Sequence, residues 1–294
     1  MGKISMLSDV LKEKIQTAYR RYLSEKELKP RAGQRIMIAE IAKTLGQIET
    51  DEEDVRTSEN HIAVIQAGTG TGKTVAYSLA AIPVTLAMEK KLVIATATVA
   101  LQEQILFKDL PDIAKHSGLQ FSFALAKGRG RYICLQQLHQ AGDASDIPDF
   151  FPELAAVNHD ANAQRLIARL ADALDSKKWN GERDTWPEVI ADQTWQTLTI
   201  DHARCGGKRC DYYDECAFFK ARSSLHSADV VVANHDIVLA DLALGGGAIL
   251  PPTDKTVFIF DEAHHLPIKA LEHFAQFARL NLSQKWLDDA AKML

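Results

Sequence analysis

Apolar side chains recur along this chain with two different spacings, which predict where helices and strands form. Residues 7–28 carry apolar side chains at helical spacing, and Pro30 ends that helix. A second helix is expected from about Gln34. Later segments with helical character are 73–88, 99–110 and 161–174. Short, continuous apolar runs that predict strands are 61–67, 91–97, 121–126, 230–233 and 257–260.

Apolar strands alternate with helices through most of the chain, which indicates a parallel sheet covered by helices on both faces. Between about 112 and 218 the alternation is replaced by an acidic patch at 146–153, one helix and a cysteine-rich segment. We therefore predict an α/β fold whose parallel sheet is interrupted by a mainly helical insertion. Polar residues after the strands are expected at the carboxyl edge of the sheet, where ligands bind.

Composition and charge limit the size, the possible partners and the cellular location expected for this protein. The 294 residues are 46% hydrophobic, enough for a large domain with an insertion. A formal net charge of −5 means that any nucleic-acid surface must be local. The amino terminus has no apolar signal core, and no run of about 18 apolar residues is present. We therefore expect a cytoplasmic protein without a membrane partner.

A glycine-rich loop follows the first apolar run and opens a helix, which is the context of a phosphate-binding loop. Its glycines allow backbone N–H groups to turn toward phosphate oxygens at a helix N-terminus. Lys73 is expected to bridge the β- and γ-phosphates, and the Thr74 hydroxyl to bind Mg²⁺. The residues expected to bind ATP in this loop are Gly68, Thr69, Gly70, Thr71, Gly72, Lys73 and Thr74.

Two adjacent carboxylates leave the last predicted strand at Asp261 and Glu262. Hydrolysis of a nucleotide needs one carboxylate to hold Mg²⁺ and another to orient and deprotonate water, and we assign Asp261 and Glu262 to these tasks in that order. A solvated acidic strand end is the alternative. Upstream, Gln34 is placed to read the adenine edge, although a glutamine at a helix start is usually only solvated.

Four cysteines, one alone and three close together, predict a metal site in the insertion: Cys134, Cys205, Cys210 and Cys216. In a reducing compartment such residues are more often metal ligands than disulfides. Four thiolates suit either Zn²⁺ or an iron–sulfur cluster, and their spacing does not select between them. Polar neighbours such as Arg204 and Asp211 argue against four buried free thiols.

A series of motifs gives the chain a family resemblance: Q-A-G-T-G-T-G-K-T, T-A-T-V-A-L-Q-E-Q, G-R-G-R-Y-I-C, K-W-N-G-E-R-D, C-x4-C-x5-C, V-V-V-A-N-H-D and D-E-A-H-H. In this order they resemble the superfamily 2 iron–sulfur helicases of the XPD/DinG group, most of all its bacterial DinG branch. The resemblance extends from about residue 30 to 270. It implies a RecA-like domain of an ATP-dependent DNA helicase that binds single-stranded DNA and DNA with 5′ single-stranded tails, and moves 5′→3′.

The same resemblance implies the cofactor and a division of the chain. The four cysteines would hold a [4Fe–4S] cluster, and His264 would couple the DEAH box to the rest of the motor. Expected segments are the first part of helicase domain 1 at 1–111, the cluster insertion at 112–218, the rest of domain 1 at 219–267 and the start of an arch insertion at 268–294. Gln66 departs from the family, whose members usually have Glu there.

The expected activity of this chain is limited by what its sequence lacks. The second motor domain and its arginine finger do not occur before Leu294, so we expect ATP binding with weak hydrolysis unless that domain is supplied in cis or in trans. The alternative is a non-motor, metal-stabilised DNA-binding or regulatory module, or half of a split helicase.

Candidate DNA contacts come from two segments. In similar helicases the segment after the second strand touches the DNA backbone, and in this chain it carries Thr96, Thr98 and Gln104. On the insertion, basic and aromatic side chains suited to a single strand occur together: Arg129, Arg131 and Tyr132. The alternative for these rings is packing around the metal site. We expect packing for Phe218 and Phe219 and leave both possibilities open for the tyrosines.

Overall fold

The computed structural model describes residues 7–49, 51, 56–58, 61–68, 70–142, 161–201 and 204–275. Within them, four parallel strands form one sheet in the order β2-β3-β1-β4. Their bounds are β1 Lys91–Thr96, β2 Phe123–Leu125, β3 Val230–Asn234 and β4 Thr256–Phe260. Central strand β1 pairs with β3 through Leu92 opposite Val230, and with β4 through Leu92 opposite Val257. The acidic patch at 146–153 and residues 276–294 lie outside the described residues.

Alternate residues of the central strand face two separate cores, so the sheet is covered on both sides as expected. Leu92 and Ile94 pack in a core shared with the amino-terminal helices, whereas Val93 and Ala95 pack on the opposite face. Helices in the first core are α1 Asp9–Glu25, α2 Ala32–Gly46, α3 Lys73–Ala87 and α5 Leu110–Ser117. Helices on the second face are α10 Ala217–Ser227 and α11 His235–Ala243. The α/β, RecA-like fold class is confirmed.

The remaining helices of the sheet domain surround its carboxyl edge. Helix α4 (Val99–Gln104) follows β1 and continues through a π-turn (Ile105–Asp109) into α5. Helix α12 (Leu266–Phe274) follows β4 and packs against α11. Side-chain caps fix several helix starts: Ser8 caps α1, Thr98 caps α4 and Asn234 caps α11. None of the described helices is both long and apolar enough to cross a bilayer.

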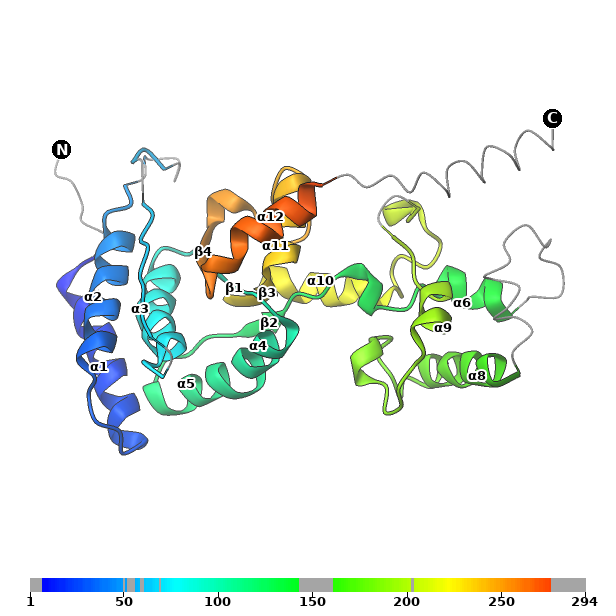
Figure 1. Cartoon of the computed structure of the whole chain (residues 1–294), viewed down its shortest axis with the longest axis horizontal. Coiled ribbons are helices and arrows are strands. Elements are labelled where there is room, and N and C mark those ends of the chain that lie inside the picture. Colours follow the sequence, from blue (N-terminus) through cyan, green and yellow to red (C-terminus); the bar gives the residue numbers. More distant parts are fainter. Residues whose placement is uncertain are drawn as a thin grey trace.

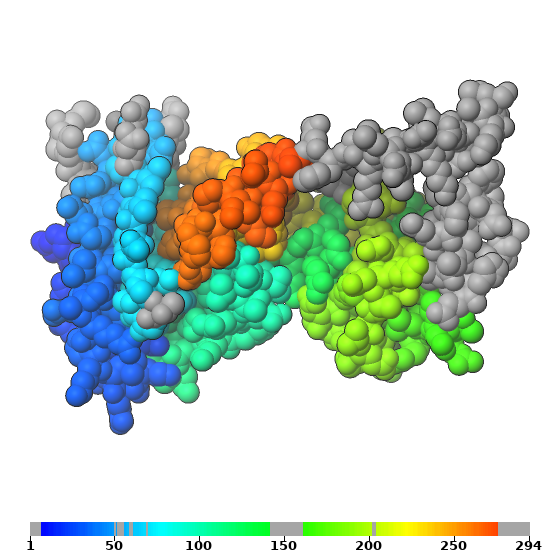
Figure 2. All heavy atoms as spheres, in the orientation of Figure 1, coloured from blue at the N-terminus to red at the C-terminus, as the bar shows by residue number. Residues whose placement is uncertain are grey.

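The insertion forms a second lobe beside the sheet (Figures 1 and 2). It contains α6 (Leu135–Gly142), α8 (Ala161–Asp175) and α9 (Asp192–Thr197), and returns to the sheet through α10. Its own core includes Leu170, Trp179 and Trp195. Since α5 packs on α1 and β2 pairs with β3, the chain leaves the sheet after Leu125, later than the expected boundary at 112.

One predicted strand is not formed. Residues 61–67 have no sheet pairing, and the Ile62 and Val64 side chains are 82% and 92% exposed. An apolar run shows only that a segment suits a strand, whereas pairing requires an adjacent strand edge in register. In the described structure this segment reaches no such edge, and β4 ends the sheet on that side.

Candidate functional site

The glycine-rich loop is held against the start of α2. Gly70 and Gly72 have positive φ angles of 77° and 79°, which glycine adopts without strain. A Cβ atom on Gly72 would lie 2.2 Å from Gln34 Nε2, so the close approach also requires glycine. Arg31 donates to the Gly70 carbonyl, and Gln34 Nε2 donates to the Gly72 carbonyl at 3.3 Å. The expected contact Thr69 lies outside the described residues.

Gln34 links this loop to the first helix. Its side chain is 7% exposed, and its Oε1 accepts a hydrogen bond from the Tyr19 hydroxyl at 3.1 Å. Both ends of the Gln34 amide are therefore used inside the protein. Reading of the adenine edge by Gln34 stays a prediction, because it requires these hydrogen bonds to be exchanged for bonds to the base.

The DEAH box meets the glycine-rich loop directly. Lys73, the first residue of α3, lies 2.6 Å from Glu262 Oε1 at the end of β4. The hydrogen bond with Glu262 raises the pKa of Lys73, and the same bond lowers the pKa of Glu262. Glu262 has a left-handed backbone (φ 52°), which turns the chain out of the strand. Two residues far apart in sequence thus meet, and their catalytic roles stay predictions.

Asp261 is fixed by neighbouring strands and by α3. Its backbone N–H donates to Ala95 O on β1 at 2.8 Å, and its carbonyl lies 3.0 Å from His235 Nε2, next to β3. The Asp261 carboxylate accepts from the Tyr77 hydroxyl at 3.2 Å and from the Glu262 N–H at 3.0 Å. Asp261 therefore presents a held carboxylate at the carboxyl edge of the sheet.

Two of these residues were not identified from the sequence. His235 is fully buried, and burial lowers its pKa, so it acts as a neutral hydrogen-bonding ring. Its position after β3 is the signal that was available, since strand ends of a parallel sheet meet at one edge. Tyr77 lies one helical turn beyond Thr74, which places both on the same face of α3.

His264 occupies the rim of this centre. Its ring is 67% exposed, and Nδ1 lies 3.4 Å from Glu262 Oε2. In the described structure the DEAH histidine is therefore mostly exposed, with one ring nitrogen beside the Glu262 carboxylate. Its proposed role of coupling the box to the rest of a motor stays a prediction.

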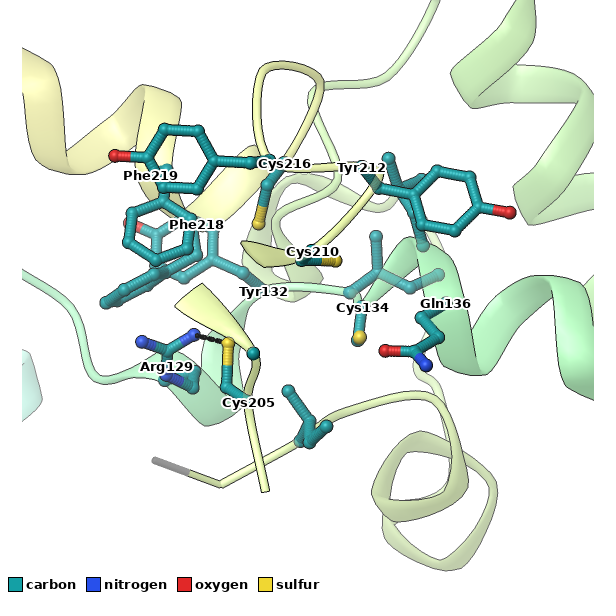
Figure 3. A pocket seen from close by; sticks show the side chains of 15 residues that line it. Arg129, Tyr132, Cys134, Gln136, Cys205, Cys210, Tyr212, Cys216, Phe218 and Phe219 are labelled. Atoms are coloured by element: carbon teal, nitrogen blue, oxygen red, sulfur yellow. Dashed lines mark hydrogen bonds between the residues drawn. The ribbon is translucent and has the colours of Figure 1, made fainter. Parts of the chain in front are cut away.

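All four cysteines line one pocket at the base of the insertion (Figure 3). Cys134 precedes α6, Cys216 precedes α10, and the other two flank a short 3₁₀ turn (Gly207–Arg209). Figure 3 shows their sulfur atoms turned toward a common space. Burial raises the pKa of Cys134, and charge on Cys216 and Cys205 would raise it further.

The four thiols do not by themselves identify a metal. Among the described residues, no group of three or more His, Cys, Asp or Glu side chains is placed so that it could hold a metal ion. Four thiols are a donor set that suits either Zn²⁺ or an iron–sulfur cluster. A metal at these cysteines therefore stays a prediction.

Arg129 closes one side of the cysteine pocket. Its Nη1 donates to Cys205 Sγ at 3.0 Å, and its guanidinium lies 4.0 Å from the centre of the Phe218 ring. Tyr132 is 6% exposed and meets Phe218 edge-on at 5.7 Å. Phe218 and Phe219 both line the pocket, which agrees with the expected packing around the site.

The expected DNA contacts are mostly engaged within the protein. Arg131 forms an ion pair with Asp184, while Arg129 and Tyr132 serve the cysteine pocket. The contacts after β1 are local: Thr96 Oγ1 donates to Thr98 O at 3.0 Å, Thr98 caps α4, and Gln104 Nε2 donates to Asp109 at 3.3 Å. DNA binding by these residues stays a prediction.

Comparison with known proteins agrees with this geometry. Residues 44–148 match the family model of the DEAD/DEAH box helicase. The chain is 40% identical over 260 residues to an "ATP-dependent DNA helicase DinG" of Photobacterium profundum, covering 88% of this chain and 36% of that protein. Proteins of the same name from Salmonella choleraesuis and Escherichia coli K12 are 39% and 40% identical, over 86% and 81% of this chain.

The matches extend across both lobes but not across the whole of those relatives. The chain spans about a third of the length of the curated relatives it matches, at 36%, 34% and 32%. A parallel sheet with a glycine-rich loop facing a DEAH box is the structural counterpart of the matched family. The geometry and these matches support a DinG-type DEAD/DEAH-box helicase, of which this chain corresponds to the N-terminal part.

Proposed function

We propose that this chain is the ATP-binding part of an ATP-dependent DNA helicase that moves 5′→3′ along single-stranded DNA. The observation that carries the proposal is the contact of Lys73 with Glu262 at 2.6 Å, which brings the phosphate-binding loop and the DEAH box into one site. A bound triphosphate would supply new anionic partners for Lys73, and Glu262 would then be free to orient water. The helicase name of the relatives supports DNA as the polymer.

Mg²⁺ in this proposal is held by the Thr74 hydroxyl and by Asp261. Both residues are next in sequence to the Lys73–Glu262 pair, and Asp261 Oδ2 accepts a hydrogen bond from the Tyr77 hydroxyl at 3.2 Å. When bound, Mg²⁺ would offset the negative charge of the phosphate groups during hydrolysis. Gly68, Gly70 and Gly72 leave the backbone of the loop accessible to phosphate oxygens.

Hydrolysis coupled to movement needs more than this site. An arginine finger contributes on the order of 10³–10⁵ in rate to enzymes of this chemistry. We propose that this arginine belongs to a second motor domain that lies outside these 294 residues. The greater length of the relatives supports that arrangement.

We further propose a [4Fe–4S] cluster in the pocket formed by Cys134, Cys205, Cys210 and Cys216. When bound, the cluster would supply four iron–thiolate bonds that tie Cys134 to the returning segment before α10. The surrounding loops and short turns have few backbone ladders of their own, so such bonds would stabilise the insertion. A single strand of DNA would run along the carboxyl edge past Thr96, Thr98 and Gln104 toward the insertion, with Arg129, Arg131 and Tyr132 near its path.

Nucleotide binding by the whole chain tests the central claim. A fluorescent ATP analogue should bind in the presence of Mg²⁺, and Lys73→Ala should weaken binding by roughly 100-fold, as expected for loss of a charged hydrogen bond to phosphate. Lys26→Ala is the matched control, because Lys26 pairs with Asp112 away from the loop. Equal binding by all three proteins would contradict an ATP site at Lys73.

DNA specificity is tested separately. ATP turnover by the chain combined with its second motor domain should rise on adding single-stranded DNA, and unwinding should require a 5′ tail. Unwinding of substrates that carry only a 3′ tail would contradict the proposed polarity while leaving the ATP site intact.

A further inference from the structure

Tyr77 occupies an unusual place for a tyrosine, because its ring is in the core while its hydroxyl reaches the nucleotide site. The residue is 4% exposed and belongs to α3, one turn after Thr74. Its hydroxyl donates to Asp261 Oδ2 at 3.2 Å. The buried Tyr77 hydroxyl thus joins α3, the helix that follows the phosphate-binding loop, to the end of β4, which carries the DEAH box.

The Tyr77 hydroxyl acts as a hydrogen-bond donor to the Asp261 carboxylate. Burial raises its pKa well above the usual value, and the negative charge of Asp261 raises it further. Asp261 Oδ1 accepts the Glu262 N–H, so each carboxylate oxygen has one partner within the protein. These two hydrogen bonds restrict rotation of the carboxylate, and each oxygen keeps a lone pair for a further partner.

We propose that Tyr77 is a positioning residue for the magnesium-bound nucleotide, because its hydroxyl holds the Asp261 carboxylate in the orientation that Mg²⁺ requires. Mg²⁺ demands a nearly ideal octahedron, so it is sensitive to small rotations of a ligand or of a carboxylate that holds its water. Tyr77 would not touch the nucleotide itself. This inference rests on the proposed ATP site and adds to it a residue that determines metal affinity.

Tyr77→Phe tests the inference because it removes only the hydroxyl. Binding of a fluorescent, slowly hydrolysed ATP analogue is measured in EDTA and over a Mg²⁺ titration, using the whole chain. We expect the Mg²⁺ concentration at half-maximal effect to rise about tenfold, the size expected for one hydrogen bond to a charged group. Affinity in EDTA should stay within about twofold of the unaltered protein, because Tyr77 does not contact the nucleotide.

Tyr22→Phe is the matched control. Tyr22 also donates its hydroxyl to a carboxylate at 2.8 Å, but this carboxylate belongs to Asp112 on α5 and not to the DEAH box. This variant should leave the Mg²⁺ titration unchanged, and thermal unfolding of both variants reports any general loss of stability.

The outcomes separate two kinds of failure. Mg²⁺-dependent binding by the unaltered chain together with an unchanged titration for Tyr77→Phe would overturn the role of Tyr77 alone. An equal loss of binding with and without Mg²⁺ would also overturn it, because Tyr77 would then be purely structural. Absence of nucleotide binding by the unaltered chain would overturn the ATP site and, with it, this inference.

Discussion

The nucleotide site and the cysteine pocket both bring together distant segments, yet they are held in different ways. At the nucleotide site, Asp261 is bonded to β1 through Ala95, and Lys73 already meets Glu262. The cysteine pocket is made from loops, helix starts and a 3₁₀ turn, with Arg129 donating to Cys205. The sheet therefore preassembles the first site, whereas the second would gain further stability from the metal proposed at its thiols.

Removal of one thiol should give the largest difference between the cysteine pocket and the nucleotide site. Cys134→Ser is expected to abolish the absorbance near 400 nm of anaerobically purified protein, because the remaining ligands all lie on the returning segment. Binding of the ATP analogue should stay within about twofold, since the two sites share no partner. Absorbance and iron content are measured beside nucleotide affinity on the same samples.

Gln136→Ser is the control for this change, because Gln136 lines the same pocket without offering a thiol. It should retain the absorbance. A colourless unaltered protein that contains zinc would contradict the cluster, and loss of nucleotide binding in Cys134→Ser would contradict the independence of the two sites.

Arg129 and Tyr77 can be compared directly, because each donates a hydrogen bond to a proposed metal ligand at its own site. Arg129→Gln removes a charged donor to Cys205 Sγ and should lower the reduction potential of the cluster by about 50 mV, close to a tenfold change for one electron. A redox titration followed by electron paramagnetic resonance measures the shift. Arg131→Gln removes the same charge from a residue paired with Asp184, and an equal shift there would show a mere effect of net charge.

The ion pair at the nucleotide site predicts a modest pH dependence of stability. The pKa of Glu262 is lowered from 4.5, so its contribution is full above pH 4.5 and is lost as pH falls through the folded value. The pKa of Lys73 is raised from 10.5, so its contribution is full below pH 10.5 and is lost as pH rises through the folded value.

Glu262→Gln should flatten the acid limb of this dependence. The side chains are 25% and 29% exposed, so the pair contributes under about 1 kcal/mol to the free energy of unfolding. Urea unfolding measured on both sides of pH 4.5 gives the difference. A Glu262→Gln protein whose stability falls as steeply in acid as that of the unaltered chain would assign the acid limb to other carboxylates.

Some features of the two sites could be predicted from the sequence. The spacing of apolar residues is a local property of the sequence, and it predicted the strands of the sheet. Ligands generally bind where parallel strands end, and this rule predicted that Lys73 meets the DEAH box. Four cysteines of one type are conspicuous in any sequence. Their gathering in one pocket followed from chemistry more than from spacing.

The hydrogen-bond partners of individual side chains could not be predicted from the sequence. Tyr77 follows the helical pattern of buried residues, and nothing in that pattern shows that its hydroxyl meets Asp261. His235 is a single histidine in an apolar segment, and its contact with the Asp261 carbonyl depends on how β3 and β4 flank β1. Arg129 and Arg131 have equal charge and near-equal position, yet one faces a sulfur and the other a carboxylate.

The segment 61–67 gives the smallest expected effect and the sharpest test of strand prediction. Val64 is 92% exposed, so Val64→Asp should change the free energy of unfolding by no more than about 0.5 kcal/mol. Val93→Asp, in fully buried β1, should cost several kcal/mol, because it places an unpaired carboxylate in the core. Urea unfolding of the two variants gives the comparison.

A large loss in Val64→Asp would reverse this interpretation of the segment. Residues 61–67 would then pair along β4, the strand that ends the described sheet on that side. Such pairing would bury Ile62 or Val64 and would fix the loop at both ends, by a strand before it and by α3 after it. Nucleotide affinity would then fall together with stability in Val64→Asp, whereas an unpaired segment leaves affinity unchanged.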